Sequence, residues 1–387
     1  MSSLRFIAAC LVVAQHASLV WADGQESAAL LRPGFAAVSL FFMLSGFVLT
    51  WSGRPGTSAR TFWRGRAARI YPTHLVALAG GILLLWAFGQ GVPVRQWLPN
   101  ALLVQTWSPH FNLLDAGVNP VSWSLCCEAA FYVIFPLLVR LANAIPAARL
   151  WRWAAAAMAT TMLVPVLVTV LRPAVEGEPT FGYFPVTLHQ MWLVYAFPLA
   201  RLPEFLLGVL LARLVREGRA HGVRLWHGAV ALAVVLPFQL RAPLLFSIAA
   251  LTVIPFTAIM LGAVNSDVRS GPTFLRNRVL VWLGGVTFGL YMTHFLVIQN
   301  GYELLDPSHT AGALQKLLYT AVLLAAALIV AVLMYRCVEL PMMRLLSGRR
   351  RSGARTGRET VVVPEPLVEA LLPGRETPSK TEMQSEA

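Results

Sequence analysis

Charged residues are scarce in this chain of 387 residues, where they make up 13%, about half the share of an ordinary soluble domain. Hydrophobic residues make up 57%. The scarcity of charge argues against a soluble globular protein. Apolar runs of about 20 residues are what a helix needs to cross a bilayer, and runs of this kind recur along the chain. The composition therefore predicts a polytopic membrane protein.

Acidic residues are the scarcer kind of charge, since 18 Asp and Glu stand against 31 Lys and Arg and give a formal net charge of +13. Such an excess can indicate nucleic-acid binding. The sequence, however, has neither a basic face interleaved with aromatics nor a known nucleic-acid motif. The basic residues lie in short clusters between apolar runs, so membrane topology explains them better and no nucleic-acid partner is expected.

Cysteine is also rare, and none of the four cysteines forms a CxxC pair or a Cys/His spacing typical of metal ligands. We therefore predict no metal site and expect buried, reduced, structural thiols. The N-terminal apolar run contains Gln15 and His16 and has no convincing signal-peptide cleavage site, so we interpret it as a retained first span. The cysteines are Cys10, Cys126, Cys127 and Cys337.

Ten apolar windows are long enough to cross a bilayer, and they predict an all-α bundle of about ten transmembrane helices. Pro198 and Pro203 interrupt the sixth window, and a tight hairpin around Arg241 and Pro243 joins the seventh to the eighth. The windows cover residues 5–22, 35–52, 70–89, 122–142, 151–172, 188–215, 225–240, 243–263, 279–299 and 314–337.

The basic residues divide unequally between the two sides of these spans. Most of the 31 Lys and Arg fall on one side if the N-terminus is cytoplasmic. The positive-inside rule therefore predicts a multi-pass protein of the plasma (inner) membrane with a cytoplasmic N-terminus. Residues 345–387 lose the apolar pattern and are rich in Pro, Glu, Ser and Thr, which predicts a disordered cytoplasmic tail.

Ionisable side chains inside membrane spans are costly and are candidates for function by default. Arg5 and His16 lie eleven positions apart in the first span, and eleven steps of about 100° bring them to one helix face, roughly 16 Å apart. His16 then lies near mid-membrane, where an imidazole can take a proton from a hydroxyl. A histidine that only hydrogen-bonds a neighbouring helix explains the same position equally well.

A cluster of arginines precedes the third span in RTFWRGRAARIYP, residues 60–72. Arginine forks bind phosphate well, and the interleaved aromatics could stack on a purine, so a phosphorylated compound such as coenzyme A would fit. Positive-inside anchoring explains the same residues. The arginines named for phosphate binding are Arg64, Arg66 and Arg69.

Further candidates lie in the fourth and ninth spans. Glu128 is buried in residues 119–135, where its carboxylate could orient a histidine or bind hydroxyls, and Trp123 could offer a sugar a stacking face. Tyr291 and His294 end the segment LGGVTFGLYMTH, and either a packing role or a role in the site fits them.

Two Arg and Glu pairs lie three residues apart, on one helix face each. They are Arg201 with Glu204 and Arg336 with Glu339. Side chains at this spacing are neighbours on a helix, so mutual neutralisation is the first explanation for both pairs.

Taken in order, these segments resemble the acyltransferase 3 family of integral membrane acyltransferases. The resemblance covers about residues 4–345, and we assign residues 1–344 to one membrane acyltransferase domain. It implies transfer of an acyl group, often acetyl, from cytoplasmic acyl-CoA to a hydroxyl of a carbohydrate or of a natural product such as a macrolide. It rests on the Arg5 and His16 spacing and on SLFFMLSGFVLT (39–50), FWRGRAARIYP (62–72), VSWSLCCEAAFYVIFP (121–136), RLPEFLLG (201–208), LYMTH (290–294) and YRCVELPMMR (335–344).

The resemblance also implies roles for individual residues. His16 corresponds to the family's essential histidine, as general base or transient acyl acceptor, Arg5 to its paired arginine, and Glu128 to its acid after Trp-Ser-Leu. The three arginines correspond to the basic cytoplasmic motif. Acyl-CoA is then a co-substrate, and no permanently bound cofactor is expected.

Trp123, Tyr291 and His294 are our candidates for binding the acceptor. A membrane transporter that uses buried His, Glu and Arg as proton or substrate sites is the alternative function, and the broken sixth span is its best argument.

Overall fold

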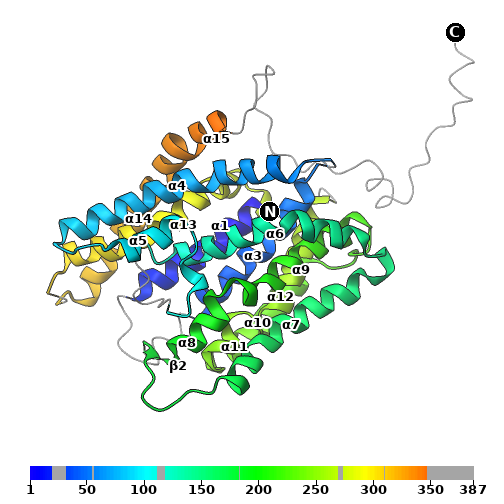
Figure 1. Cartoon of the computed structure of the whole chain (residues 1–387), viewed down its shortest axis with the longest axis horizontal. Coiled ribbons are helices and arrows are strands. Elements are labelled where there is room, and N and C mark those ends of the chain that lie inside the picture. Colours follow the sequence, from blue (N-terminus) through cyan, green and yellow to red (C-terminus); the bar gives the residue numbers. More distant parts are fainter. Residues whose placement is uncertain are drawn as a thin grey trace, which may run out of the picture.

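The computed structural model describes residues 1–19, 32–54, 56–110, 118–182, 184–268, 273–308 and 310–346. Within these ranges the protein is a bundle of helices, and one short hairpin is the only β-structure (Figure 1). The α-helices are α1 (Ser2–Ser18), α3 (Arg32–Ser52), α4 (Ala59–Ala87), α5 (Val94–Ala101), α6 (Ser122–Ala144), α7 (Leu150–Leu171), α8 (Leu188–Met191), α9 (Pro198–Arg216), α10 (Leu225–Arg241), α11 (Leu244–Ile248), α12 (Val253–Val268), α13 (Arg278–Leu305), α14 (Ala313–Met334) and α15 (Leu340–Leu346).

Shorter elements connect these helices. Two π-helical turns, η4 and η6, interrupt longer helical segments, and β1 pairs antiparallel with β2. The short elements are η2 (Gln105–Trp107), η3 (Ala147–Arg149), β1 (Thr180–Phe181), β2 (Phe184–Thr187), η4 (Trp192–Ala196), η5 (Phe274–Arg276) and η6 (Tyr335–Glu339).

The predicted all-α, multi-pass fold is confirmed. Each of the ten predicted windows falls on a helix, and eight of the described helical segments are long and apolar enough to cross a membrane. The other two windows correspond to α1 and α10, which have 17 residues each. The segments long enough to cross are Arg32–Ser52, Ala59–Ala87, Ser122–Ala144, Ala147–Leu171, Leu188–Arg216, Leu244–Val268, Arg278–Leu305 and Ala313–Leu345.

The sixth and eighth predicted windows are each broken, and proline explains the break in the sixth. Phe197 is extended, and Pro198 begins α9, because a residue without an N–H and with a preset φ suits the first turn of a helix. Pro203 was expected to interrupt the span as well, but it lies inside α9 and does not end it. The eighth window is also broken, since α11 ends at Ile248 and α12 begins at Val253.

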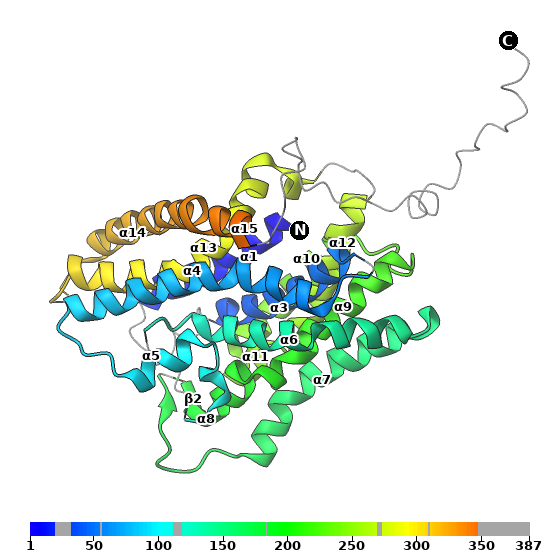
Figure 2. The ribbon, with the colours of Figure 1, turned by 45° about the horizontal axis from the view of Figure 1, so that its top comes forward.

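Helix α3 lies at the centre of the bundle, packed against α1 on one side and α9 on the other. In both views, α13, α14 and α4 lie together on one side of it and α7 lies on the opposite side (Figures 1 and 2). A Cβ on Gly46 would lie 2.1 Å from the Phe205 carbonyl oxygen, and one on Gly208 would lie 2.0 Å from that of Met43. These glycines therefore let α3 and α9 cross at backbone contact, as small residues do between membrane helices.

The segments that the charge pattern assigns to the cytoplasm meet at one end of the bundle. The Met1 amine lies 3.6 Å from the Asp267 carboxylate, at the end of α12. Arg216, at the end of α9, donates to the Thr50 carbonyl at the end of α3, 2.8 Å away. These contacts agree with the charge pattern, which assigns these segments to one side of the membrane. That this end faces the cytoplasm stays a prediction.

The expectation that all four cysteines are buried is wrong for two of them. Cys126 and Cys127 are buried, but Cys10 and Cys337 are exposed, because each lies on the side of its helix that faces away from the bundle. Helix α15 ends at Leu346, and the domain boundary at 344 stays a prediction. The rest of the predicted tail lies outside the described residues.

Candidate active site

Helices α1 and α13 bring two histidines together inside the bundle. His16 Nδ1 lies 2.9 Å from His294 Nε2, and the two rings are 5.0 Å apart. His294 is fully buried, and its other ring nitrogen, Nδ1, lies 3.0 Å from the Leu290 carbonyl oxygen one turn earlier. Phe295 packs edge-on against the His16 ring. The structure thus fixes the imidazole of His294 at both nitrogens.

Tyr291 links this histidine pair to α6 and α3. Its hydroxyl lies 2.7 Å from Ser124 Oγ, and its ring packs against Phe41 at 5.5 Å and His294 at 5.9 Å. Tyr291 and His294, both singled out from the sequence, therefore lie in one site with His16.

Glu128 lies one turn beyond Ser124 on α6. Its Oε1 accepts hydrogen bonds from Ser45 Oγ and the Tyr132 hydroxyl, each 2.5 Å long. Glu128 was expected to orient His16 or the acceptor, but the residue seen in contact with His16 is His294. A role for Glu128 toward the acceptor stays a prediction. Sequence reasoning missed Ser45 and Tyr132, although Tyr132 follows Glu128 by the four residues that make helical neighbours.

One face of α6 forms a polar stripe, which we define as Ser124, Glu128 and Tyr132. These residues are spaced by four, so they lie one above another, and the stripe runs about 12 Å along the helix. At its far end, Trp63 Nε1 of α4 donates to the Tyr132 carbonyl at 2.9 Å, and Phe62 packs edge-on against the Tyr132 ring. The stripe therefore connects the histidine pair with the arginine-rich start of α4.

The arginines of α4 differ in their surroundings. Arg64 is exposed, and Arg66 is half-buried with its guanidinium carbon 6.0 Å from the centre of the Phe62 ring. Arg69 Nη2 lies 3.9 Å from Glu339 Oε1. Arg5 is half-buried in the first two turns of α1, toward the end of the bundle where Met1 lies. At roughly 16 Å along the helix from His16, Arg5 makes no direct hydrogen bond to it.

Comparison with known proteins identifies the family. Residues 1–336 match the acyltransferase 3 family, described as an acyltransferase domain. The chain belongs to this family. It is therefore a multi-pass membrane acyltransferase, with the fold that the family resemblance implied.

Named relatives of this acyltransferase agree with the family. It is 39% identical to the acyltransferase MdmB of Streptomyces mycarofaciens, over 91% of this chain and 92% of that protein. It is 24% identical to the peptidoglycan O-acetyltransferase OatA of Listeria monocytogenes, over 87% of this chain but 54% of OatA, so it spans about half of that relative. It is 26% identical to Nodulation protein 10 of Rhizobium leguminosarum, over 77% of this chain and 82% of that protein. No solved structure matches the chain.

The acyltransferase pairs Glu339 with Arg69, and the predicted pair of Arg336 with Glu339 is wrong. The side chain of Glu339 is 1% exposed. Glu339 ends the π-helical turn η6, whose wider winding changes the direction of side chains three residues apart, so the spacing rule for an α-helix does not apply. Its carboxylate therefore turns to α4.

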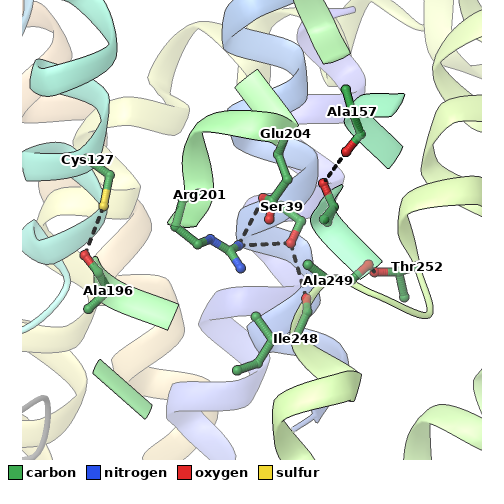
Figure 3. Close-up of polar contacts among 10 residues, drawn as sticks. Ser39, Cys127, Ala157, Ala196, Arg201, Glu204, Ile248, Ala249 and Thr252 are labelled. Carbon is green, nitrogen blue, oxygen red and sulfur yellow. Dashed lines mark hydrogen bonds and ion pairs between the residues drawn. The ribbon is translucent and has the colours of Figure 1, made fainter. Parts of the chain in front are cut away.

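The predicted pair of Arg201 and Glu204 is confirmed and lies deep in the acyltransferase (Figure 3). Arg201 Nη2 lies 3.1 Å from Glu204 Oε2 and donates to Ser39 Oγ at 2.9 Å, and both charged side chains are 1% exposed. The rings of Phe42 and Tyr195 lie 5.4 and 5.7 Å from the guanidinium carbon. The pair therefore ties α9 to α3 through charge and ring contacts.

Trp123 belongs to the core of the acyltransferase. It is 5% exposed, with Tyr195 4.1 Å away and Phe42 6.2 Å away between ring centres. The sequence suggested this indole as a stacking face for a sugar. Its ring packs against Phe42 and Tyr195, the two rings that lie beside the Arg201 guanidinium, and a role in binding the acceptor stays a prediction.

Proposed function

We propose that this acyltransferase transfers an acyl group, in the first place acetyl, from acyl-CoA to a hydroxyl of a carbohydrate or of a natural product such as a macrolide. The observation that carries this proposal is the polar stripe on α6, which joins the arginines of α4 to the pair of His16 and His294. The name of OatA, a peptidoglycan O-acetyltransferase, supports a hydroxyl acceptor.

The donor would bind at the arginine end of the stripe. Arg64, Arg66 and Arg69 supply guanidinium groups whose forks match phosphate oxygens, and Arg5 adds charge at the same end of the bundle. The thin pantetheine arm would follow the stripe and bring the thioester toward His16. In this arrangement the N-terminus and the donor site face the cytoplasm, and the protein lies in the plasma membrane.

Transfer then needs a base at the acceptor hydroxyl. His16 Nε2 takes the hydroxyl proton while the acceptor oxygen forms a bond to the thioester carbonyl carbon. The carbon–sulfur bond breaks, and the CoA thiolate leaves and takes the proton back from His16. In the second route His16 itself accepts the acyl group and passes it to the acceptor oxygen. Glu128, held by Ser45 and Tyr132, is the candidate for orienting the acceptor.

Release of free CoA tests the proposed function. The purified protein in detergent is given acetyl-, propionyl- and longer acyl-CoAs with a panel of sugar and macrolide acceptors. We expect CoA release that depends on one class of acceptor, together with an acylated product detected by mass spectrometry. If the protein neither binds nor consumes any acyl-CoA, acyl-CoA is not its donor.

A transporter is the second candidate, because the sixth span breaks at Phe197 close to the buried Arg201 and Glu204. The cavity beside this pair has a volume of about 10 Å³, which is room for about one water molecule. A cavity of this size does not admit a substrate beside the pair. Substrate flux across liposomes without CoA would favour the transporter.

The contact between Arg69 and Glu339 gives a prediction about the donor. Glu339→Gln removes the charge that pairs with Arg69 on α4, so we expect the KM for acyl-CoA to rise about 3- to 10-fold with little change in kcat. In an Arg69→Gln background the same change should have no further effect. Steady-state kinetics with varied acyl-CoA measures both.

Glu217→Gln is the matched control for that change. Glu217 also pairs with an arginine at this end of the bundle, Arg213, at 2.8 Å, but the pair is at the end of α9 and not on α4. Its KM for acyl-CoA should stay at the wild-type value. An unchanged KM in Glu339→Gln would show that Glu339 does not act through Arg69.

A further inference from the structure

The contacts of His294 allow one arrangement of protons in the histidine pair. Its Nδ1 lies 3.0 Å from the Leu290 carbonyl oxygen. A carbonyl can only accept, so this nitrogen carries the hydrogen. A neutral imidazole has a single N–H, which leaves Nε2 of His294 as an acceptor. Because His294 is fully buried, the uncharged ring is the form that its apolar surroundings favour.

The position of the proton on the neutral His16 ring follows from that on His294. Its Nδ1 lies 2.9 Å from the acceptor nitrogen of His294, so Nδ1 of His16 must donate. The lone pair of the neutral His16 ring is then on Nε2, the nitrogen on the far side of the ring from His294. His16 therefore presents its basic nitrogen away from α13.

We propose that His294 is a positioning residue that sets the tautomer and the direction of His16, and so makes His16 Nε2 the nitrogen that meets the acceptor hydroxyl. This inference rests on the proposed function for the role of His16 as a base. It replaces two sequence-based assignments, namely Glu128 as the group that orients His16 and His294 as a group that binds the acceptor.

The arrangement does the work that a buried carboxylate does in hydrolases, where the acid holds the histidine in the correct tautomer. A neutral imidazole differs from a carboxylate in one respect, because it brings no negative charge into the membrane interior. Its acceptor nitrogen still receives the Nδ1–H of His16 when Nε2 gains a proton. The anchoring bond to Leu290 comes from the helix that carries His294, so the acceptor direction is fixed by α13 itself.

Substitution of His294 tests the inference through kcat. His294→Leu removes the imidazole acceptor of His16 Nδ1 and leaves the backbone of Val12 as the partner of the ring, so we expect kcat to fall about 10²- to 10⁴-fold. The KM values for donor and acceptor should stay near wild type. His294→Gln can place an amide oxygen close to the position of Nε2 and should recover at least a tenth of the wild-type kcat. A raised acceptor KM with unchanged kcat in His294→Leu would show that His294 binds the acceptor instead.

His74→Leu is the control for the loss of a buried imidazole. His74 is also fully buried, and its Nε2 lies 2.9 Å from the Asn100 carbonyl oxygen, but it is on α4 and contacts neither histidine of the pair. We expect kcat to stay close to wild type in this variant. An equal fall of kcat in His74→Leu and His294→Leu would assign both effects to general loss of structure.

Nitrogen NMR tests the tautomer without any catalysis. In protein labelled with ¹⁵N-histidine, the signals lost in His16→Ala identify His16. We expect its Nδ1 to carry the hydrogen and its Nε2 to be bare at neutral pH, and we expect this preference to be weaker in His294→Leu, where the backbone of Val12 is the partner left to the ring. A hydrogen on Nε2 of wild-type His16 would overturn the inference. Because this measurement needs no substrate, it can fail while acyl transfer is confirmed, or succeed while the donor proves wrong.

Discussion

Replacing His16 with alanine should lower the rate of acyl transfer by at least about 10²- to 10⁴-fold, the range that a general base contributes, and leave the protein folded. The variant should fold because residues other than His16 make most of the packing contacts of α1. Leu4, Ala8 and Val12 pack its buried face into the core. The half-buried ring of His16 adds mainly its bond to His294 and its contact with Phe295. CoA release by the purified variant measures the rate.

Two controls keep the His16→Ala result interpretable. The thermal unfolding midpoint in detergent should stay near wild type, and the variant should still bind acyl-CoA because the arginines of α4 are at the other end of the stripe. A stable His16→Ala protein with wild-type turnover would refute the role of His16 in either chemical route.

The two routes are separated by looking for a covalent acyl group. Wild-type protein is incubated with radiolabelled acyl-CoA in the absence of acceptor and quenched. Label on wild-type protein that is missing from His16→Ala would assign the acyl-histidine route. If no label is retained although acceptor-dependent turnover is intact, His16 acts as a general base.

The helices could be predicted because their signals are local. Apolar windows of membrane-crossing length each produced a helix, and Pro198 set the start of α9 through its own missing N–H. The clusters of basic residues also predicted which segments lie on the same side of the membrane. Each of these signals depends on a few neighbouring residues, so a sequence contains it in full.

The centre of the candidate site depends on packing between distant segments. His16 and His294 are 278 residues apart in the chain. Both histidines stood out as ionisable groups in spans, but no spacing in the sequence says that α1 lies against α13. The same limit applies to Ser45, a serine in an apolar helix that becomes a partner of Glu128 only when α3 meets α6.

The two Arg and Glu pairs show where a local rule holds and where it stops. Arg201 and Glu204 lie in regular α-helix, and the three-residue spacing predicted their contact. Arg336 and Glu339 have the same spacing but lie in the π-helical turn η6, where Glu339 meets Arg69 instead. The two pairs differ because a π-helical turn winds more widely than an α-helix, and the sequence alone does not reveal where such a turn lies.

Removing one partner of the buried pair should strongly destabilise the fold. Arg201→Met leaves the Glu204 carboxylate, 1% exposed, without its cation, and we expect a loss of about 3–5 kcal/mol in the free energy of unfolding. The double variant Arg201→Met with Glu204→Gln leaves no charge behind and should be more stable than the single variant. Denaturant-induced unfolding in detergent measures the order of stability.

A second Arg and Glu pair supplies the matched comparison. Arg172 lies 3.3 Å from Glu178, but its side chain is 50% exposed and that of Glu178 is 25% exposed. Arg172→Met should therefore cost no more than about 1 kcal/mol, because water solvates the remaining carboxylate. If Arg201→Met were as mild as Arg172→Met, or if the double variant were less stable than the single one, charge burial would not be the source of the effect. The expected order instead makes the Arg201 and Glu204 pair a condition for holding α9 against α3, where the Phe42 ring contacts both Arg201 and Trp123.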